Sequence, residues 1–124
     1  MNILVVDDDA DIRYAIANIV RKCDCQVSEA GSVAQAIERL DSEPYNVVFC
    51  DVRFRGGPGG EEFLDHTGQH YPDIHVVMIS TWMDVRQQTD LISRGAAQCL
   101  QKPFFRDTCL AVLGKLGKND SGQA

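Results

Sequence analysis

Five short apolar runs alternate with helical patterns along the chain, and this alternation constrains the fold more than any other feature. The runs cover residues 3–6, 26–29, 46–50, 75–79 and 98–100. The first, third and fourth runs are continuously apolar and rich in β-branched residues, which is typical of strands buried on both faces. The second is half polar and the fifth is short, so we expect both toward the edges of a sheet.

Helical patterns occupy the intervals between these strands. The predicted helices cover residues 12–20, 33–40, 60–71, 84–94 and 105–116. Ser32 followed by Gln35 is a capping-box pattern that predicts the start of the second helix. Gly68 weakens the third helix, and Pro72 marks its end. Strict alternation of strand and helix predicts an α/β fold, with a parallel sheet, helices on both faces and right-handed crossovers.

The length of 124 residues fits one compact domain. We predict this domain over residues 1–117 and a disordered tail or truncated linker over 118–124, where the composition is polar. No signal-peptide pattern opens the chain, and no run approaches the ~20 apolar residues that span a bilayer. Five cysteines without metal-ligand spacing indicate a reduced compartment. We therefore expect a cytoplasmic protein that makes no membrane contact.

The formal net charge is −6, which argues against nucleic-acid binding by this domain, because phosphate contact needs a basic face. Some of the acidic excess gathers near the start, at Asp7, Asp8, Asp9 and Asp11. Such a cluster either binds a cation or is a solvated turn, and composition alone favours the turn. An EF-hand is excluded, because Ile12 stands where that loop needs glycine.

Chemistry-bearing residues follow the ends of the predicted strands. They are Asp7 and Asp8, Asp51, Ser80 and Thr81, and Lys102 and Pro103. In an open parallel sheet, ligands bind beyond the carboxyl ends of the strands. Close carboxylates resist joint ionisation unless a cation lies among them, and a small hard ion such as Mg²⁺ prefers oxygen ligands. A carboxylate can also attack phosphorus while a metal and a lysine neutralise the transferred group, so this rim predicts phosphoryl chemistry.

Each of these residues has an ordinary interpretation when taken alone. Asp51 can simply end a strand, and Lys102 can be a solvated surface lysine. Their placement on one rim with Asp7 and Asp8 favours a site. The glycine-rich segment 56–60 lacks the GK[ST] ending of a P-loop, so we predict a flexible loop there.

Four segments in order, LVVDDD, VVFCDVRF, VVMIST and CLQKPF, resemble the receiver domains of response regulators in two-component systems. The resemblance covers about residues 1–116 and implies a flavodoxin-like (βα)5 fold with strand order 2-1-3-4-5. It implies a signalling phosphoacceptor rather than an enzyme. The phosphoryl group would come from a sensor histidine kinase or a histidine phosphotransfer protein. The surface of the fourth helix, fifth strand and fifth helix would then change, and a homodimer would form through it.

The resemblance also assigns roles at the metal and phosphoryl site. Asp51 would be the phosphoacceptor and a ligand of Mg²⁺ or Mn²⁺. Asp8 would bind the metal directly, Asp7 through a water, and Arg53 through its backbone carbonyl. Lys102 would pair with the phosphoryl group.

Further residues would couple the phosphoryl group to the surface. Ser80, with Thr81 beside it, would supply the switch hydroxyl, and Pro103 would follow a cis peptide bond. Cys99 departs from the family pattern, which commonly has an aromatic switch residue there, so the usual switch is in doubt. Trp82 and Arg53 occupy variable positions beside the phosphate, where both are large.

Two alternatives belong to other functional classes. A haloacid-dehalogenase-like phosphohydrolase would use Asp7 as its nucleophile and Asp9 as the second aspartate, but would normally carry a cap for which the chain has no room. A pseudo-receiver that binds partners without phosphate is the other alternative. The intact set of Asp51, Ser80 and Lys102 counts against it.

Overall fold

The structure is a computed structural model that describes residues 1–56 and 59–121, with only the backbone described for 117–121. Strands and helices alternate strictly along the described residues. They are β1 Asn2–Val6, α1 Ala10–Arg21, β2 Gln26–Ala30, α2 Val33–Ser42, β3 Val47–Asp51, α3 Gly60–His70, β4 His75–Ser80, α4 Val85–Ser93, β5 Gln98–Gln101 and α5 Arg106–Ser121. The strands are parallel and lie in the order β2-β1-β3-β4-β5. This confirms the predicted fold class and topology, including the two edge strands.

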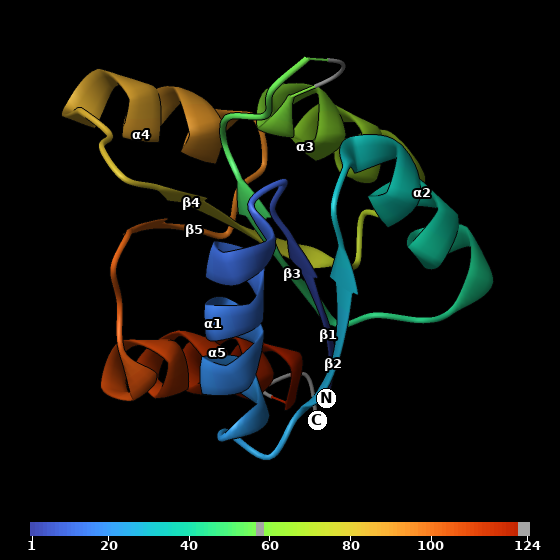
Figure 1. Cartoon of the computed structure of the whole chain (residues 1–124), viewed down its shortest axis with the longest axis vertical. Helices are drawn as coiled ribbons and strands as arrows, with labels where there is room; N and C mark the ends of the chain where they lie inside the picture. Colours follow the sequence, from blue (N-terminus) through green and yellow to red (C-terminus); the bar gives the residue numbers. More distant parts are fainter. Residues whose placement is uncertain (57–58, 122–124) are drawn as a thin grey trace.

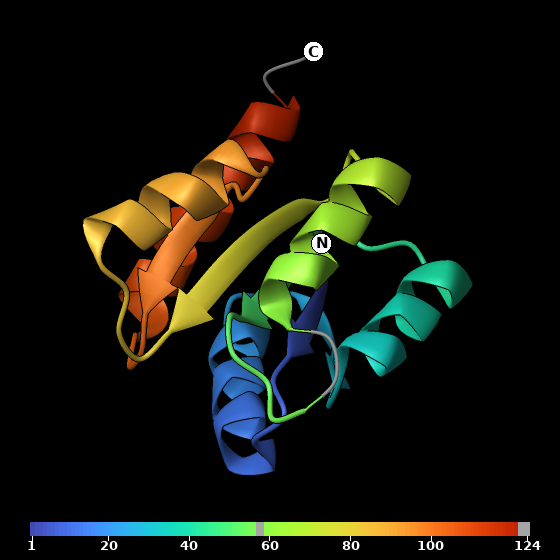
Figure 2. The ribbon, with the colours of Figure 1, turned by 90° about the horizontal axis from the view of Figure 1, so that it is seen from above.

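Helices cover both faces of the sheet (Figure 1). Helices α2, α3 and α4 lie on one face, and α1 and α5 lie on the other, as the view from above also shows (Figure 2). Side chains alternate between the two cores along each central strand: Leu4 and Val6 of β1 enter the first core, whereas Ile3 and Val5 enter the second. This double burial explains why β1, β3 and β4 are apolar without interruption.

The ends of two helices differ from their predicted forms. Ser32 is the N-cap of α2 and its hydroxyl accepts from the N–H of Gln35, as predicted, at 3.1 Å. The Gln35 side chain, however, accepts from the N–H of Gly31 at 2.6 Å instead of completing a capping box with Ser32. Helix α5 continues to Ser121, beyond its predicted end at residue 116.

The division between a domain over 1–117 and a tail over 118–124 stays a prediction, because residues 122–124 lie outside the described part. Gly57 and Pro58 of the predicted glycine loop also lie outside it. No helix within the described residues combines the length and the apolar character that crossing a membrane requires.

Candidate functional site

Three aspartates converge where β1 and β3 end. These strands are neighbours, with Val6 paired to Cys50, so the residues just beyond the pair come together at one edge. One carboxylate oxygen from each of Asp7, Asp8 and Asp51 lies within 4.8 Å of the others. Asp7 is 1% exposed and Asp51 9%. The rim predicted from the sequence is therefore a compact acidic cluster, of which Asp51 is the last residue of β3.

Hydrogen bonds fix the orientation of these carboxylates. Asp7 accepts from the backbone N–H of Asp9 at 3.0 Å through Oδ1 and from Lys102 Nζ at 2.8 Å through Oδ2. Asp8 Oδ2 accepts from the backbone N–H of Arg55 at 3.0 Å. Lys102 Nζ lies 3.4 Å from Asp51 Oδ1, so it is closer to Asp7 than to the predicted nucleophile.

The charges at this site favour an added cation. Burial raises the pKa of Asp51; Lys102 opposes this effect, Asp7 adds to it, and the N–H of Arg53 donates a hydrogen bond that lowers the pKa. One lysine faces three carboxylates, so negative charge is left uncompensated. Oxygen ligands of this kind fit a small, hard divalent cation.

Gly60 brings α3 against the site. A Cβ at this position would lie 2.3 Å from the backbone oxygen of Asp51 and 2.9 Å from Cα of Val52, so only glycine fits. The N–H of Gly60 donates to the carbonyl of Val52 at 3.1 Å. The prediction of a flexible loop across 56–60 is wrong at Gly60, which is the first, tightly packed residue of α3. The predicted helix over residues 60–71 already placed Gly60 at a helix start, which was the feature of the sequence that indicated this.

The hydroxyl of Ser80 contacts the backbone of its own turn. Ser80 is 2% exposed, and its Oγ donates to the carbonyl of Trp82 at 2.8 Å and accepts from the N–H of Trp82 at 3.3 Å. The Thr81 and Trp82 side chains are exposed beside it. The Ser80 hydroxyl therefore stabilises the turn that follows β4. Its role as a switch stays a prediction.

The loop after β5 is tied to the same edge. Lys102 and Pro103 are joined by a cis peptide bond, as the family resemblance implied. The N–H of Lys102 donates to the carbonyl of Ser80 at 2.7 Å. Cys99 in β5 packs against the core that lies under α4, and its burial raises the pKa of its thiol.

Residues 3–113 match the family model of the response regulator receiver domain. The chain belongs to this family. Sequence, fold and acidic cluster thus agree, and the protein is a receiver domain of a two-component response regulator. Domains of this family interact with histidine kinases or phosphotransfer proteins.

Known proteins similar to this receiver domain differ greatly in length. It is 30% identical over 112 residues to the nitrogen assimilation regulatory protein NtrX of Azorhizobium caulinodans, covering 90% of this chain and 25% of that protein. It is 29% identical over 119 residues to the chemotaxis protein CheY of Listeria monocytogenes, covering 95% of this chain and 99% of that protein. The crystal structure of the receiver domain of NtrX from Brucella abortus has a TM-score of 0.86 at 30% identity, covering 92% of this chain and 96% of that one.

Asp9 belongs to the helix start rather than to a second catalytic pair. It is the N-cap of α1, and its Oδ1 accepts from the N–H groups of Asp11 at 3.0 Å and Ile12 at 3.1 Å. The phosphohydrolase alternative needed Asp9 to work with Asp7. Membership of the receiver family and the engaged Asp9 side chain both argue against that alternative.

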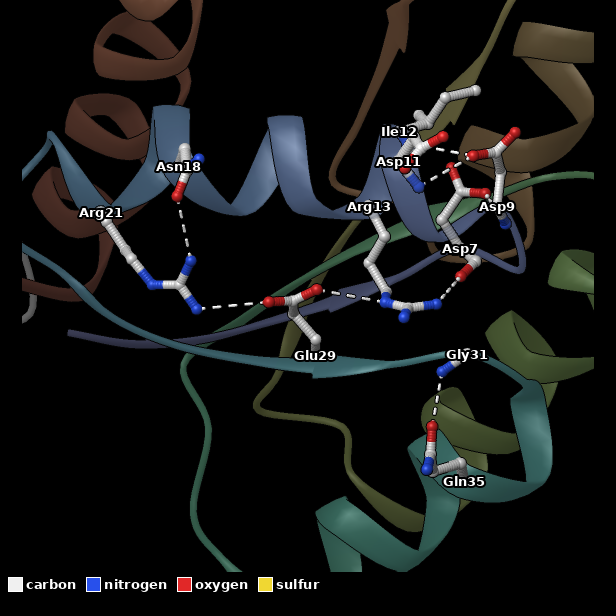
Figure 3. Close-up of polar contacts among 10 residues, drawn as sticks. All are labelled: Asp7, Asp9, Asp11, Ile12, Arg13, Asn18, Arg21, Glu29, Gly31 and Gln35. Carbon is white, nitrogen blue, oxygen red and sulfur yellow. Dashed lines mark hydrogen bonds and ion pairs between the residues drawn. The ribbon is translucent and has the colours of Figure 1, made fainter.

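Two charged residues around Asp7 are not apparent from the sequence pattern. Arg13 of α1 donates from Nη1 to the backbone oxygen of Asp7 at 2.9 Å and from Nε to Glu29 of β2 at 3.1 Å (Figure 3). One feature of the sequence could have indicated this pair: Glu29 is a charged residue within a predicted strand, where it needs a partner such as Arg13.

Proposed function

We propose that this receiver domain is phosphorylated on Asp51 with the help of Mg²⁺ or Mn²⁺. The observation that carries the proposal is the meeting of three carboxylates and one lysine at a single edge of the sheet. Asp8 and Asp51 would bind the ion directly and Arg53 through its carbonyl. Asp7 would act through a water, because both of its oxygens already accept hydrogen bonds. Once bound, the ion supplies positive charge to the phosphoryl oxygens.

The side chains of the site divide the remaining work. An oxygen of Asp51 attacks phosphorus, and the bond from phosphorus to the donor imidazole nitrogen breaks as that ring leaves. Lys102 lies 3.4 Å from Asp51 Oδ1, so a small movement brings its ammonium group to a phosphoryl oxygen. Ser80 would exchange its hydrogen bond with the Trp82 carbonyl for one to the phosphoryl group. The domain thus assists its own phosphorylation and turns over no separate substrate.

An apolar hollow beside the site supports a protein donor. It has a volume of about 410 Å³ and is lined by Ile12, Ile16 and Ile19 of α1 together with Pro103 and Phe105. Phe105 is 72% exposed at its edge. A helix that carries the donor phosphohistidine, from a sensor kinase or a phosphotransfer protein, would cover this apolar surface while its histidine reaches Asp51.

The surface of α4, β5 and α5 is proposed as the output face and as a homodimer interface. Val85 is 78% exposed and Ile92 48% on α4, which supports contact with another protein surface. The net charge of −6 supports an output that does not involve nucleic-acid binding by this domain. The chain spans 25% of the length of its NtrX relative, so the output of a longer regulator is also a proposal.

Labelling with a small phosphodonor tests the function. Incubation with acetyl phosphate and Mg²⁺ should add one phosphoryl group by intact mass, and EDTA should prevent the addition. Asp51→Asn should abolish it. Asp11→Asn, which removes a nearby carboxylate outside the cluster, should not. Unchanged labelling of Asp51→Asn would place the nucleophile elsewhere and refute the assignment.

A further inference from the structure

Arg13 connects α1 to the ends of two strands. Its Nη1 donates to the carbonyl of Asp7 after β1, and its Nε donates to Oε1 of Glu29 in β2. Figure 3 shows the guanidinium group between these two residues. The Arg13 and Glu29 side chains are 21% and 26% exposed, so both are largely withdrawn from solvent. The ion pair holds the plane of the guanidinium group and thereby aims Nη1 at Asp7.

A glycine makes room for this arrangement. A Cβ at Gly31 would lie 3.1 Å from Nη1 of Arg13, which is closer than ordinary contact. Gly31 directly follows β2, whose last residue, Ala30, accepts from the N–H of Asp7 at 3.2 Å. Arg13 and the end of β2 therefore hold the backbone of Asp7 from both sides.

The carbonyl that Arg13 holds belongs to the peptide group between Asp7 and Asp8. Because a peptide group is planar, holding this carbonyl holds the plane that runs from Cα of Asp7 to Cα of Asp8. The two side chains depart from the ends of this plane, so its orientation sets the positions from which both carboxylates enter the site. One hydrogen bond therefore acts on two of the three acidic residues of the cluster.

We propose that Arg13 is a positioning residue for the metal site, setting its affinity by orienting Asp7 and Asp8. The inference rests on the proposed function, since it concerns the cation that phosphorylation would use. Residues that orient metal ligands without touching the metal typically change affinity by 10–100-fold when they are replaced.

The charge of Arg13 and its hydrogen bond to Asp7 should affect metal affinity in opposite directions. A positive side chain near the site repels a cation, so removal of its charge alone would tighten metal binding. Glu29 already offsets that charge at 3.1 Å. Removal of the orienting hydrogen bond would weaken metal binding. The direction of the change therefore identifies the mechanism.

The test measures Mg²⁺ affinity by calorimetry without any phosphodonor, for the wild type, Arg13→Gln, Arg13→Lys and Arg21→Gln. We expect both Arg13 variants to bind about 10-fold more weakly or worse. Lysine keeps the charge but cannot bridge Asp7 and Glu29 through one rigid plane. Arg21→Gln is the matched control, because Arg21 also pairs with Glu29, at 3.3 Å, but makes no contact with Asp7 among the described residues. We expect it to bind Mg²⁺ as the wild type does.

Several results would overturn the inference. Wild-type or tighter affinity in Arg13→Gln, full rescue by Arg13→Lys, or an equal loss in Arg21→Gln would each show that Asp7 is not oriented in this way. Urea unfolding confirms that each variant is folded, and Arg13→Lys carries the test if Arg13→Gln is not. A wild type that binds Mg²⁺ but is not phosphorylated would refute the proposed function and leave the role of Arg13 measurable.

Discussion

At the scale of single residues, Gly60 decides how closely α3 approaches the proposed phosphorylation site. A Cβ there would lie 2.3 Å from the backbone oxygen of Asp51, whereas nothing lies within 4 Å of a Cβ at Gly68 in the same helix. Gly60→Ala should lower the free energy of unfolding by about 1–3 kcal/mol, as overpacking does. Gly68→Ala should raise it by about 0.5–1 kcal/mol. Urea unfolding measures both, and equal stabilities for Gly60→Ala and the wild type would contradict the close contact.

Asp51 makes the metal-free protein sensitive to pH. Burial raises the pKa of Asp51, so the folded protein holds this proton more tightly than the unfolded chain does. The free energy of unfolding therefore falls as the pH rises from the ordinary aspartate pKa, about 3.9, through the raised value. In EDTA at neutral pH, Asp51→Asn should be more stable than the wild type. The difference should shrink as the pH falls toward the ordinary pKa, and a constant difference would contradict the assignment.

Among the elements, α4 is joined to α3 by Arg94. Its guanidinium group contacts Glu61 at 2.7 Å and Asp65 at 2.7 Å, both on α3, and Asp90 on α4 at 3.4 Å. A hydrogen bond from Arg94 lowers the pKa of Asp65. This pair therefore stabilises the fold above the ordinary aspartate pKa, and the contribution is lost as the pH falls through the lowered value.

Arg94→Gln tests this connection between helices. Because Asp65 is exposed, we expect the variant to lose about 1 kcal/mol or less at neutral pH. The loss should diminish in high salt and as the pH falls below about 4. Arg86→Gln removes an exposed charge from α4, which Arg94 caps, and serves as the control. A loss that is independent of pH would mean that Arg94 acts through packing instead.

The sequence predicts the strands, the helices and the residues at the carboxyl edge of the sheet better than it predicts side-chain contacts. Continuous apolar runs identify β1, β3 and β4, and the rule for parallel sheets is enough to bring Asp7, Asp8 and Asp51 to one edge. The approach of Gly60 to Asp51 depends on where α3 packs, which local patterns do not contain. The hydrogen bond between Ser80 and Trp82 depends on a local rotamer. Arg13 acts through a hydrogen bond to the backbone, which residue type alone does not reveal.

For the whole molecule, the question is how phosphorylation at the proposed site would change the position of α4. The described contacts offer a short route: the N–H of Lys102 donates to the carbonyl of Ser80, and β5 brings Cys99 against the core under α4. Cys99 pairs in register with Met78 of β4, two residues before Ser80. A thiol at this position is too small to alternate between two ring positions. Signalling in this domain should therefore proceed through backbone and helix shifts.

Cys99→Tyr provides the decisive comparison. Because residue 99 is half-buried at the sheet edge, a ring there can turn outward and should not disturb the carboxylates. We expect labelling by acetyl phosphate to stay unchanged, while amide hydrogen exchange across Val85–Ser93 responds differently when beryllium fluoride mimics the phosphoryl group. Cys23→Ser, at a half-buried cysteine after α1, should change neither measurement. If Cys99→Tyr altered labelling and exchange together, or left both unchanged, residue 99 would not control the response of the α4 surface independently of the proposed phosphorylation site.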